Sequence, residues 1–449
     1  MSQQRKRVII ENVNPEIDNG GFPVKRVIGE KVSVEADIFT DGHDSISATL
    51  LYKRECNEKW NEARMRSIEE DRWRGEFIVD EMGVYSYTVE AWVNSFRSWQ
   101  KALEKKHAAG QNVEIDLLVG AEIVGKASER ASKDEKKKLM GYADTLRKRE
   151  NIEETILVAL GKALTELMAN YPNKQLASKY GKDLKVIVDR EKALFSTWYE
   201  SFPRSCSQGS GEHGTLRDLE GIIPEIARMG FDVLYLPPIH PIGETNRKGR
   251  NNSANTKPDD VGSPWAIGGR EGGHKSIHPE LGTMEDFESL LNRAEDYDME
   301  IAMDLAFQCS PDHPYVKEHP EWFKWRPDGT VQFAENPPKK YEDVLPINFE
   351  TENWKDLWEE LKSVVIFWVE KGVRVFRVDN PHTKPFDFWE WLIGEIKMSY
   401  PDVIFLAEAF TRPKMMYRLA KIGFTQSYTY FTWRNTKSEF TSYLTELIQ

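Results

Sequence analysis

Two acidic residues end neighbouring, mainly apolar segments in the C-terminal half of the sequence. Asp379 follows the segment 373–378, and Glu408 follows the segment 403–407. Short apolar runs bounded by Gly or Pro are typical of buried parallel strands. Because side chains alternate along a strand, Arg377 lies on the same face as Asp379. Carboxyl groups at the C-terminal ends of neighbouring parallel strands could act as a nucleophile and a general acid.

These residues have a structural and a functional interpretation. An Arg beside one Asp at a strand end is often only a structural ion pair. An Asp and a Glu that end successive strands, with an Arg two residues before the Asp, form a more specific pattern. Buried carboxylates at strand ends cost free energy unless they have a role. We therefore favour the functional interpretation for Asp379 and Glu408.

Strand and helix patterns alternate from residue 193 onward. The expected strands are 193–199, 233–236, 300–304, 372–379, 403–408 and 426–430. Short strands with one helix each indicate a parallel sheet and favour a barrel over an open sheet. We therefore assign residues 193–449 to a catalytic (β/α)8 TIM barrel that is incomplete, with about six strands present. In such a barrel the C-terminal strand ends carry the active site.

The N-terminal part of the chain has a different pattern, so the protein is multidomain. Short alternating runs separated by Asp, Gly and Asn predict a β-sandwich over residues 1–95, completed by about 183–192. Residues 96–182 predict a helical insert, in which the run 152–167 has apolar residues at helical spacing.

Composition limits the class of partner. The chain has 449 residues, of which 40% are hydrophobic and 30% charged, and a net charge of −12. These values fit a globular protein and argue against a nucleic-acid partner. No apolar run approaches the ~20 residues of a membrane span, and we expect neither a membrane partner nor a signal peptide. The three cysteines Cys56, Cys206 and Cys309 favour reduced thiols and a cytoplasmic location.

The motif around Asp379 resembles a known family. Phe-Arg-Val-Asp at 376–379, followed by Ala-Glu at 407–408, resembles the retaining α-amylase superfamily of glycoside hydrolases and transglycosylases. The run 377–385, Arg-Val-Asp-Asn-Pro-His-Thr-Lys-Pro, is similar to one branch, the α-1,4-glucan:maltose-1-phosphate maltosyltransferases. The resemblance covers nearly all of the chain. It implies a glycosyltransferase of glycogen or α-glucan biosynthesis.

The resemblance also implies a reaction. The enzyme would transfer maltosyl from α-maltose 1-phosphate to the non-reducing end of an α-1,4-glucan and release phosphate. Asp379 would be the nucleophile and Glu408 the general acid/base of a retaining double displacement, with carboxyl groups ~5–5.5 Å apart. Arg377 should keep Asp379 ionised, whereas Glu408 must hold a proton at neutral pH. The amide of Asn380 could donate to the anionic leaving group.

Binding residues are assigned from the same resemblance. Lys248, in the motif Lys-Gly-Arg-Asn-Asn, is assigned to substrate binding, and Gln308 to the donor. An irregular, aromatic and Pro-rich excursion at about 305–350 matches the domain that the superfamily inserts after strand three, and loops of this length are usually functional. Within it, the assigned residues are Asn336, Lys339 and Tyr341 for the phosphate and Asp343 for sugar hydroxyls.

Gln308 and Cys309 stand where ordinary amylases have Asn and His. This departure removes an Asn typical of the amylase calcium site. We therefore expect no calcium there, no other metal and no cofactor. Asp304, which ends the preceding strand, is assigned a structural role that orients the site.

The sequence lacks several parts that a complete superfamily member has. Two barrel strands, the C-terminal β-domain and the third catalytic Asp, which would lie beyond residue 449, are missing by this count. We therefore expect a C-terminal truncation, either natural or from an incomplete sequence. One alternative function is an amylase-type α-glucan hydrolase, in which water replaces the glucan acceptor. The other, for the truncated chain, is a non-catalytic glucan-binding protein.

The N-terminal domains have no role that the residues alone select. They could be a scaffold, a dimer contact or a weak glucan binder. In the maltosyltransferases a helical domain inserted into the sandwich is the expected arrangement, and these domains contribute to a homodimer. The resemblance therefore implies a homodimer.

Overall fold

The computed structural model of the chain describes residues 5–209, 211–257 and 259–448. It divides into two compact units, Met1–Val188 and Asp189–Gln449. In the described ranges, no helix combines the length and the apolar character that crossing a membrane requires.

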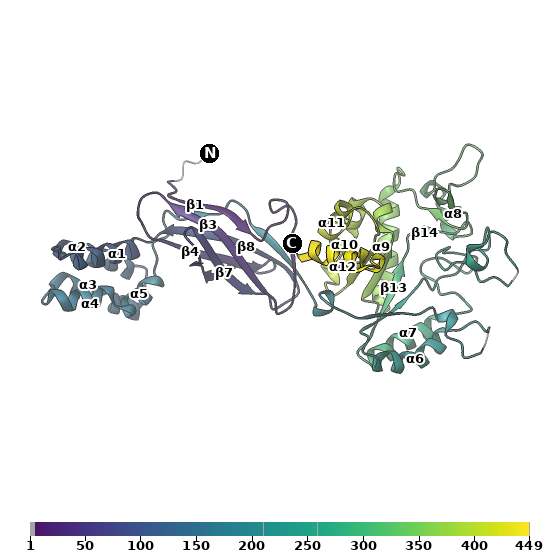
Figure 1. Ribbon diagram of the computed structural model, residues 1–449, viewed down its shortest axis with the longest axis horizontal. Coiled ribbons are helices and arrows are strands. Elements are labelled where there is room, and N and C mark those ends of the chain that lie inside the picture. Colours follow the sequence, from purple (N-terminus) through teal and green to yellow (C-terminus); the bar gives the residue numbers. More distant parts are fainter. Residues whose placement is uncertain (1–4, 210, 258, 449) are drawn as a thin grey trace. The chain divides into compact units, whose positions relative to one another are not determined.

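The first unit contains a β-sandwich of two sheets (Figure 1). One sheet has the strand order β1-β3-β7-β6, and the other has the order β2-β10-β8-β4-β5 with β9 paired to β8. The strands are β1 (Val8–Asn14), β2 (Val24–Val27), β3 (Lys31–Thr40), β4 (Ile46–Arg54), β5 (Asn61–Arg64), β6 (Arg66–Ser67), β7 (Arg72–Ile78), β8 (Gly83–Val93), β9 (Ser178–Lys179) and β10 (Leu184–Asp189).

The sandwich is held by side chains that alternate along its strands. In β3, Val32, Val34, Ala36 and Ile38 are fully buried, whereas the residues between them are less buried. They pack in one core with inward side chains of β4, β8 and β10. Removing this apolar surface from water stabilises the two packed sheets.

Five helices lie between β8 and β9 in the sequence (Figure 1). They are α1 (Ser95–Ala108), α2 (Glu114–Ser128), α3 (Lys133–Lys148), α4 (Ile152–Leu160) and α5 (Lys162–Ala169). The run 152–167, which has apolar residues at helical spacing, is helical but is divided into α4 and α5. Gly161 has an extended conformation with ψ 144°, which separates α4 from α5. Glycine favours such a break because it is a poor helix former.

The second unit is built on one parallel sheet with the order β11-β12-β13-β18-β19-β20. Its strands are β11 (Trp198–Glu200), β12 (Val233–Leu236), β13 (Glu300–Leu305), β18 (Val375–Asp379), β19 (Ile404–Glu408) and β20 (Gln426–Ser427). Its main helices are α6 (Leu216–Arg228), α7 (Met284–Glu295), α9 (Trp354–Glu370), α10 (Phe386–Ser399), α11 (Pro413–Lys421) and α12 (Lys437–Ile448). This alternation confirms the predicted fold, a (β/α) barrel with six strands present.

Local sequence signals set where the barrel helices begin. Thr215 and Thr283 precede α6 and α7, and each forms a reciprocal capping box with an Asp three residues later. Each box satisfies backbone N–H groups that a helix start leaves unpaired. The helix starts fix the lengths of the connections from one strand to the next.

The first barrel strand begins later than predicted. Residues Glu191–Ala193 form a 3-10 turn, and β11 begins at Trp198, which pairs with Val233 of β12. Leu194 and Phe195, which suggested a strand, are 68% and 74% exposed. Because β12 begins only at Val233, these residues have no neighbouring strand in the described sheet with which to form a ladder.

The connection after β13 has little regular structure. It contains two small antiparallel ladders, β14 (Gln308–Cys309) with β17 (Leu345–Pro346) and β15 (Ala334–Asn336) with β16 (Lys339–Tyr341), and the short helix α8 (Pro314–Glu318). The β14–β17 ladder joins the start and the end of this excursion. The residues between them therefore project from the C-terminal end of β13.

Candidate active site

The candidate nucleophile and acid end two adjacent strands. In the β18–β19 ladder, Asp379 pairs directly with Glu408. Neighbouring strands lie about 4.8 Å apart, which is close to the ~5–5.5 Å between carboxyl groups in retaining glycosidases. Asp379 is buried and Glu408 is partly buried. The sheet thus brings together the two carboxylates that the sequence singled out.

Arg377 contacts both carboxylates. Its Nη1 donates to Asp379 Oδ1 at 2.8 Å, and its Nη2 lies 3.6 Å from Glu408 Oε2. Burial disfavours the guanidinium charge, but the nearby carboxylates outweigh burial and raise the pKa of Arg377. A permanently charged fork between the two carboxylates fixes their relative orientation.

Asp304 and Tyr235 extend this network into neighbouring strands. Asp304 Oδ2 accepts from Arg377 Nη1 at 2.7 Å and from the Tyr235 hydroxyl at 2.5 Å. Burial raises the pKa of Asp304 to about 7, although Arg377 opposes this shift. Because Asp304 binds the guanidinium of Arg377, it helps to position Arg377 against Asp379 and Glu408.

Asn380 links the two carboxylates from the turn after β18. Its backbone N–H donates to Glu408 Oε2 at 3.2 Å, and its Nδ2 donates to Asp379 Oδ2 at 3.2 Å. The residue is left-handed, with φ 43° and ψ 53°, a conformation that Asn adopts more readily than most residues. The amide expected to meet the leaving group therefore also contacts the nucleophile, and it uses one of its two N–H donors to do so.

The two carboxylates have different surroundings. Burial raises the pKa of Glu408, and Arg377 and the Asn380 N–H only partly offset this effect. Asp379 lies nearer the guanidinium, at 2.8 Å against 3.6 Å for Glu408. A raised pKa helps Glu408 to hold a proton at neutral pH. The geometry therefore favours Glu408 as the acid and Asp379 as the nucleophile.

Two of the expected sugar-binding residues lie in one polar cluster. Lys248 is buried and forms an ion pair with Glu342, and Asn246 Nδ2 donates to the Glu342 carbonyl at 3.2 Å. The adjacent Asp343 is buried, and burial raises its pKa while Lys248 opposes the shift. The loop after β12 and the excursion after β13 thus hold Lys248 near Asp343.

The other expected binding residues make separate contacts. Gln308 donates to the Trp265 carbonyl at 3.2 Å. Asn336 and Lys339 pair across the β15–β16 hairpin and are exposed, and Tyr341 at its end is partly buried. Within the described residues, none of these four side chains has a hydrogen bond or ion pair with the carboxylate pair. Their roles at the donor stay predictions.

Aromatic rings gather beyond Glu408. Phe410 stacks on Tyr428, with ring centroids 6.0 Å apart and 11° between the ring planes. The edges of Tyr430 and Trp433 approach it at 5.8 and 6.0 Å. Phe410 and Trp433 are exposed. Exposed rings beside a catalytic acid are suited to stacking on the apolar faces of sugars.

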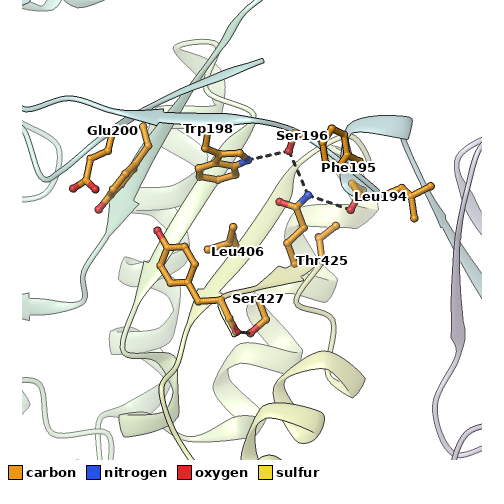
Figure 2. Close-up of a pocket in the computed structure, with 12 residues that line it drawn as sticks. Leu194, Phe195, Ser196, Trp198, Glu200, Leu406, Thr425 and Ser427 are labelled. Atoms are coloured by element: carbon orange, nitrogen blue, oxygen red, sulfur yellow. Dashed lines mark hydrogen bonds between the residues drawn. The ribbon is translucent and has the colours of Figure 1, made fainter. Parts of the chain in front are cut away.

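A cavity of about 610 Å³ lies between the edge strands β11 and β20. Figure 2 shows Trp198 and Glu200 on one side of it and Thr425 and Ser427 on the other. Tyr235 also lines this cavity. Because its hydroxyl binds Asp304, the cavity extends to the network that holds Arg377.

Known proteins resemble the chain over both units. Residues 6–190 match the model "Alpha-1,4-glucan:maltose-1-phosphate maltosyltransferase, domain N/S", and residues 198–385 match "Alpha amylase, catalytic domain". An α-1,4-glucan:maltose-1-phosphate maltosyltransferase from Myxococcus xanthus is 50% identical to this chain, and the matched region makes up 100% of this chain and 69% of that protein. A protein of the same name from Cereibacter sphaeroides is 49% identical, covering 98% and 74%. The chain belongs to this maltosyltransferase family.

Other matches set the extent of the similarity. The maltosyltransferase from Chlorobaculum tepidum is 57% identical over 445 residues, which make up 99% of this chain and 66% of that protein. The chain thus spans about two thirds of the length of the curated relatives it matches. Among solved structures, an α-amylase from Lactobacillus plantarum is 27% identical, with 56% of this chain and 59% of that chain covered and a TM-score of 0.46.

Three residues near the carboxylate pair were missed in the sequence. Tyr235 and Tyr428 flank Arg377, whose Cζ lies 5.8 and 5.9 Å from their ring centroids. Tyr235 lies in the predicted strand 233–236, whereas the predicted strand 426–430 ends at Ser427, so that Tyr428 follows β20. The approach of both rings to Arg377 depends on strand pairing and curvature. Lys384 stands inside the motif that carried the resemblance, although nothing in the sequence placed its ammonium near the carboxylates.

Three residues of metal-ligating type meet away from the carboxylates. The ligand atoms of His274, Cys309 and His313 all lie within 4.8 Å of one another. His274 Nε2 donates to the Ala306 carbonyl at 3.0 Å, so its Nδ1 accepts from His313 Nε2 at 3.0 Å. His313 Nδ1 accepts the Tyr315 backbone N–H at 3.0 Å. Since each of these ring nitrogens already has a complementary partner, the arrangement fits neutral histidines better than a metal site.

His274 and His313, together with His240, whose ring centroid lies 5.8 Å from that of His274, should make stability depend on pH. Burial lowers the pKa of His240 to about 3, of His274 to about 4 and of His313 to about 2. The unfolded chain, with histidine pKa values of about 6.5, therefore binds more protons than the folded chain below that pH. Their contribution to stability is complete above pH ~6.5 and is lost progressively as the pH falls toward 4.

Denaturant unfolding at several pH values measures this effect. We expect the midpoint to fall steadily from pH 7 to pH 5. A His274→Asn variant should be less stable at pH 7 but show a shallower pH dependence, because it removes one of the titrating groups. A midpoint that stays constant over this range would contradict a network of neutral histidines.

Proposed function

We propose that the protein transfers a maltosyl group from α-maltose 1-phosphate to the non-reducing end of an α-1,4-glucan. The observation that carries this proposal is the pairing of Asp379 with Glu408, because Arg377 and Asn380 contact both carboxylates. The names of the relatives support the choice of donor and acceptor.

The first half of the reaction uses both carboxylates. An Asp379 oxygen attacks the anomeric carbon while the bond from that carbon to the phosphate oxygen breaks. The bonding electron pair leaves with the phosphate, and Glu408 gives its proton to the departing oxygen. The product is a maltosyl ester of Asp379.

The second half reverses the roles. Glu408, now a carboxylate, removes the proton from the 4-hydroxyl of the glucan end. That oxygen attacks the anomeric carbon, and the ester bond to Asp379 breaks. Two inversions at this carbon give net retention. The aromatic cluster around Phe410 supports a glucan acceptor, because it lies just beyond the acid that must activate the acceptor hydroxyl.

Product analysis tests the proposal. With α-maltose 1-phosphate and a maltooligosaccharide, the protein should lengthen the acceptor in steps of two glucose units. Mass spectrometry should show the steps, and NMR should show that each new linkage is α. Single-glucose steps or β-linkages would contradict maltosyl transfer with retention.

We also propose that two copies associate through the helical insert. Ile115, Leu118 and Val119 share one face of α2 and are 77%, 41% and 46% exposed. Contiguous exposed apolar side chains often mark an interface. Light scattering should give a dimer mass for the unmodified protein and a monomer mass for an Ile115→Glu, Val119→Glu variant. Lys137→Glu, at an exposed position of α3, is the control. An unmodified protein that is monomeric would contradict the proposal.

Two further expectations stay predictions. They are a cytoplasmic location and a part in glycogen or α-glucan biosynthesis. Neither of them enters the two steps assigned to Asp379 and Glu408.

A further inference from the structure

Lys384 is a cation near the catalytic carboxylates, and among the described residues it has no carboxylate partner. Its Nζ donates to the Asn380 carbonyl at 3.4 Å and to the Thr383 hydroxyl at 3.2 Å. Both acceptors are neutral. Within the described part of the chain, no carboxylate lies within the 4.0 Å of an ion pair with this nitrogen. Arg377, by contrast, is committed to carboxylates through both of its terminal nitrogens.

The turn that carries Lys384 is firmly held. It contains the 3-10 turn Pro381–Thr383, in which the Thr383 hydroxyl donates to the Asn380 carbonyl at 2.8 Å. Trp389 Nε1 on α10 donates to the Pro381 carbonyl at 3.0 Å. Prolines at 381 and 385 restrict the backbone on both sides of the turn. The ammonium is therefore anchored next to Asn380, which touches both catalytic carboxylates.

The charges around Lys384 are those of the reaction site. Burial lowers the pKa of Lys384, whereas Asp379, Asp304 and Glu408 favour its charged form. The residue as a whole is only partly buried. Lys384 also acts to lower the pKa of Glu408. A fixed cation beside Glu408 favours the ionised form of this carboxyl group, and an anionic group of the substrate that pairs with the cation would offset this effect.

We infer that Lys384 binds the phosphate of the donor and stabilises the negative charge that this phosphate gains as the glycosidic bond breaks. The inference rests on the proposed function, because a neutral glucan substrate would bring no anion to this position. A lysine binds phosphate as a point charge with up to three N–H donors. Lys384 uses two of them on neutral oxygens. The second amide N–H of Asn380 is the neighbouring donor.

Two donors with different leaving groups test this role. α-Maltose 1-phosphate and α-maltosyl fluoride deliver the same maltosyl group, but only the first has phosphate oxygens. For Lys384→Gln we expect kcat/KM to fall about 10²-fold with the phosphate donor, the typical effect of removing one transition-state donor. With the fluoride donor we expect a change of less than about threefold. Lys384→Arg keeps the charge and should recover part of the loss.

The controls separate this inference from the proposed function. Lys414→Gln removes an exposed lysine at the start of α11 and should change neither rate. Inorganic phosphate should inhibit the unmodified protein more strongly than Lys384→Gln. Equal losses on both donors, or no loss on either, would overturn the role of Lys384 but would leave the proposed function standing. An unmodified protein that uses the fluoride but never the phosphate donor would overturn the proposed function and, with it, the inference.

Discussion

Replacing Glu408 by Gln should reduce kcat for maltosyl transfer about 10³-fold, in the range expected when a general acid is removed. Gln has nearly the same shape but cannot give or take the proton. The effect should be smaller for the first step with α-maltosyl fluoride, because fluoride leaves with less help from an acid. The second step still needs a base, so the maltosyl ester of Asp379 should accumulate.

Mass spectrometry of the peptide that contains Asp379 measures this accumulation. We expect a maltosyl adduct in Glu408→Gln after incubation with the fluoride and little adduct in the unmodified protein. The matched control is Glu390→Gln, an exposed glutamate of α10 that pairs only with Arg418 at 3.5 Å among the ion pairs of the described residues. Near-normal turnover by Glu408→Gln would show that another group is the acid.

Replacing Arg377 by Met should destabilise the fold by roughly 3–5 kcal/mol, the usual cost of removing one partner of a buried ion pair. Arg377 is 10% exposed, and its partners Asp304 and Asp379 are 0% and 10% exposed. Methionine fills much of the volume but leaves these carboxylates without a countercharge. Denaturant unfolding of the protein measures the loss.

Arg374→Met is the matched control, because Arg374 lies in the same segment but forms a more exposed pair with Asp402 at 2.9 Å. Such a pair contributes about 0–1 kcal/mol. Adding Asp304→Asn to Arg377→Met should recover part of the stability, because the double variant no longer buries that unpaired charge. Equal losses in Arg374→Met and Arg377→Met would contradict a buried network centred on Arg377.

Much of the barrel could be predicted because its signals are local. The strand 233–236 and the start of α7 follow directly from apolar runs and from the Thr283 capping box. The carboxylate pair was predictable for a similar reason, since alternation places Arg377 and Asp379 on one face and successive parallel strands end at one edge.

Features that depend on the third dimension were not predictable. Leu194 and Phe195 have the composition of a strand, but whether they form one depends on a neighbouring strand that does not reach them. The left-handed conformation of Asn380 directs its N–H to Glu408. This hydrogen bond forms only because β19 places Glu408 next to the turn after β18. The Lys248–Glu342 pair joins residues that are 94 positions apart in the sequence, and sequence patterns do not predict contacts between such distant loops.

Phosphate release from α-maltose 1-phosphate is the measurement that tests the proposed transfer most directly. It should be made with and without a maltooligosaccharide acceptor. We expect the protein to release phosphate at a rate that rises with acceptor concentration, one phosphate for each maltosyl group transferred. Starch hydrolysis without any phosphate release would contradict maltosyl transfer and would place Asp379 and Glu408 in a hydrolase.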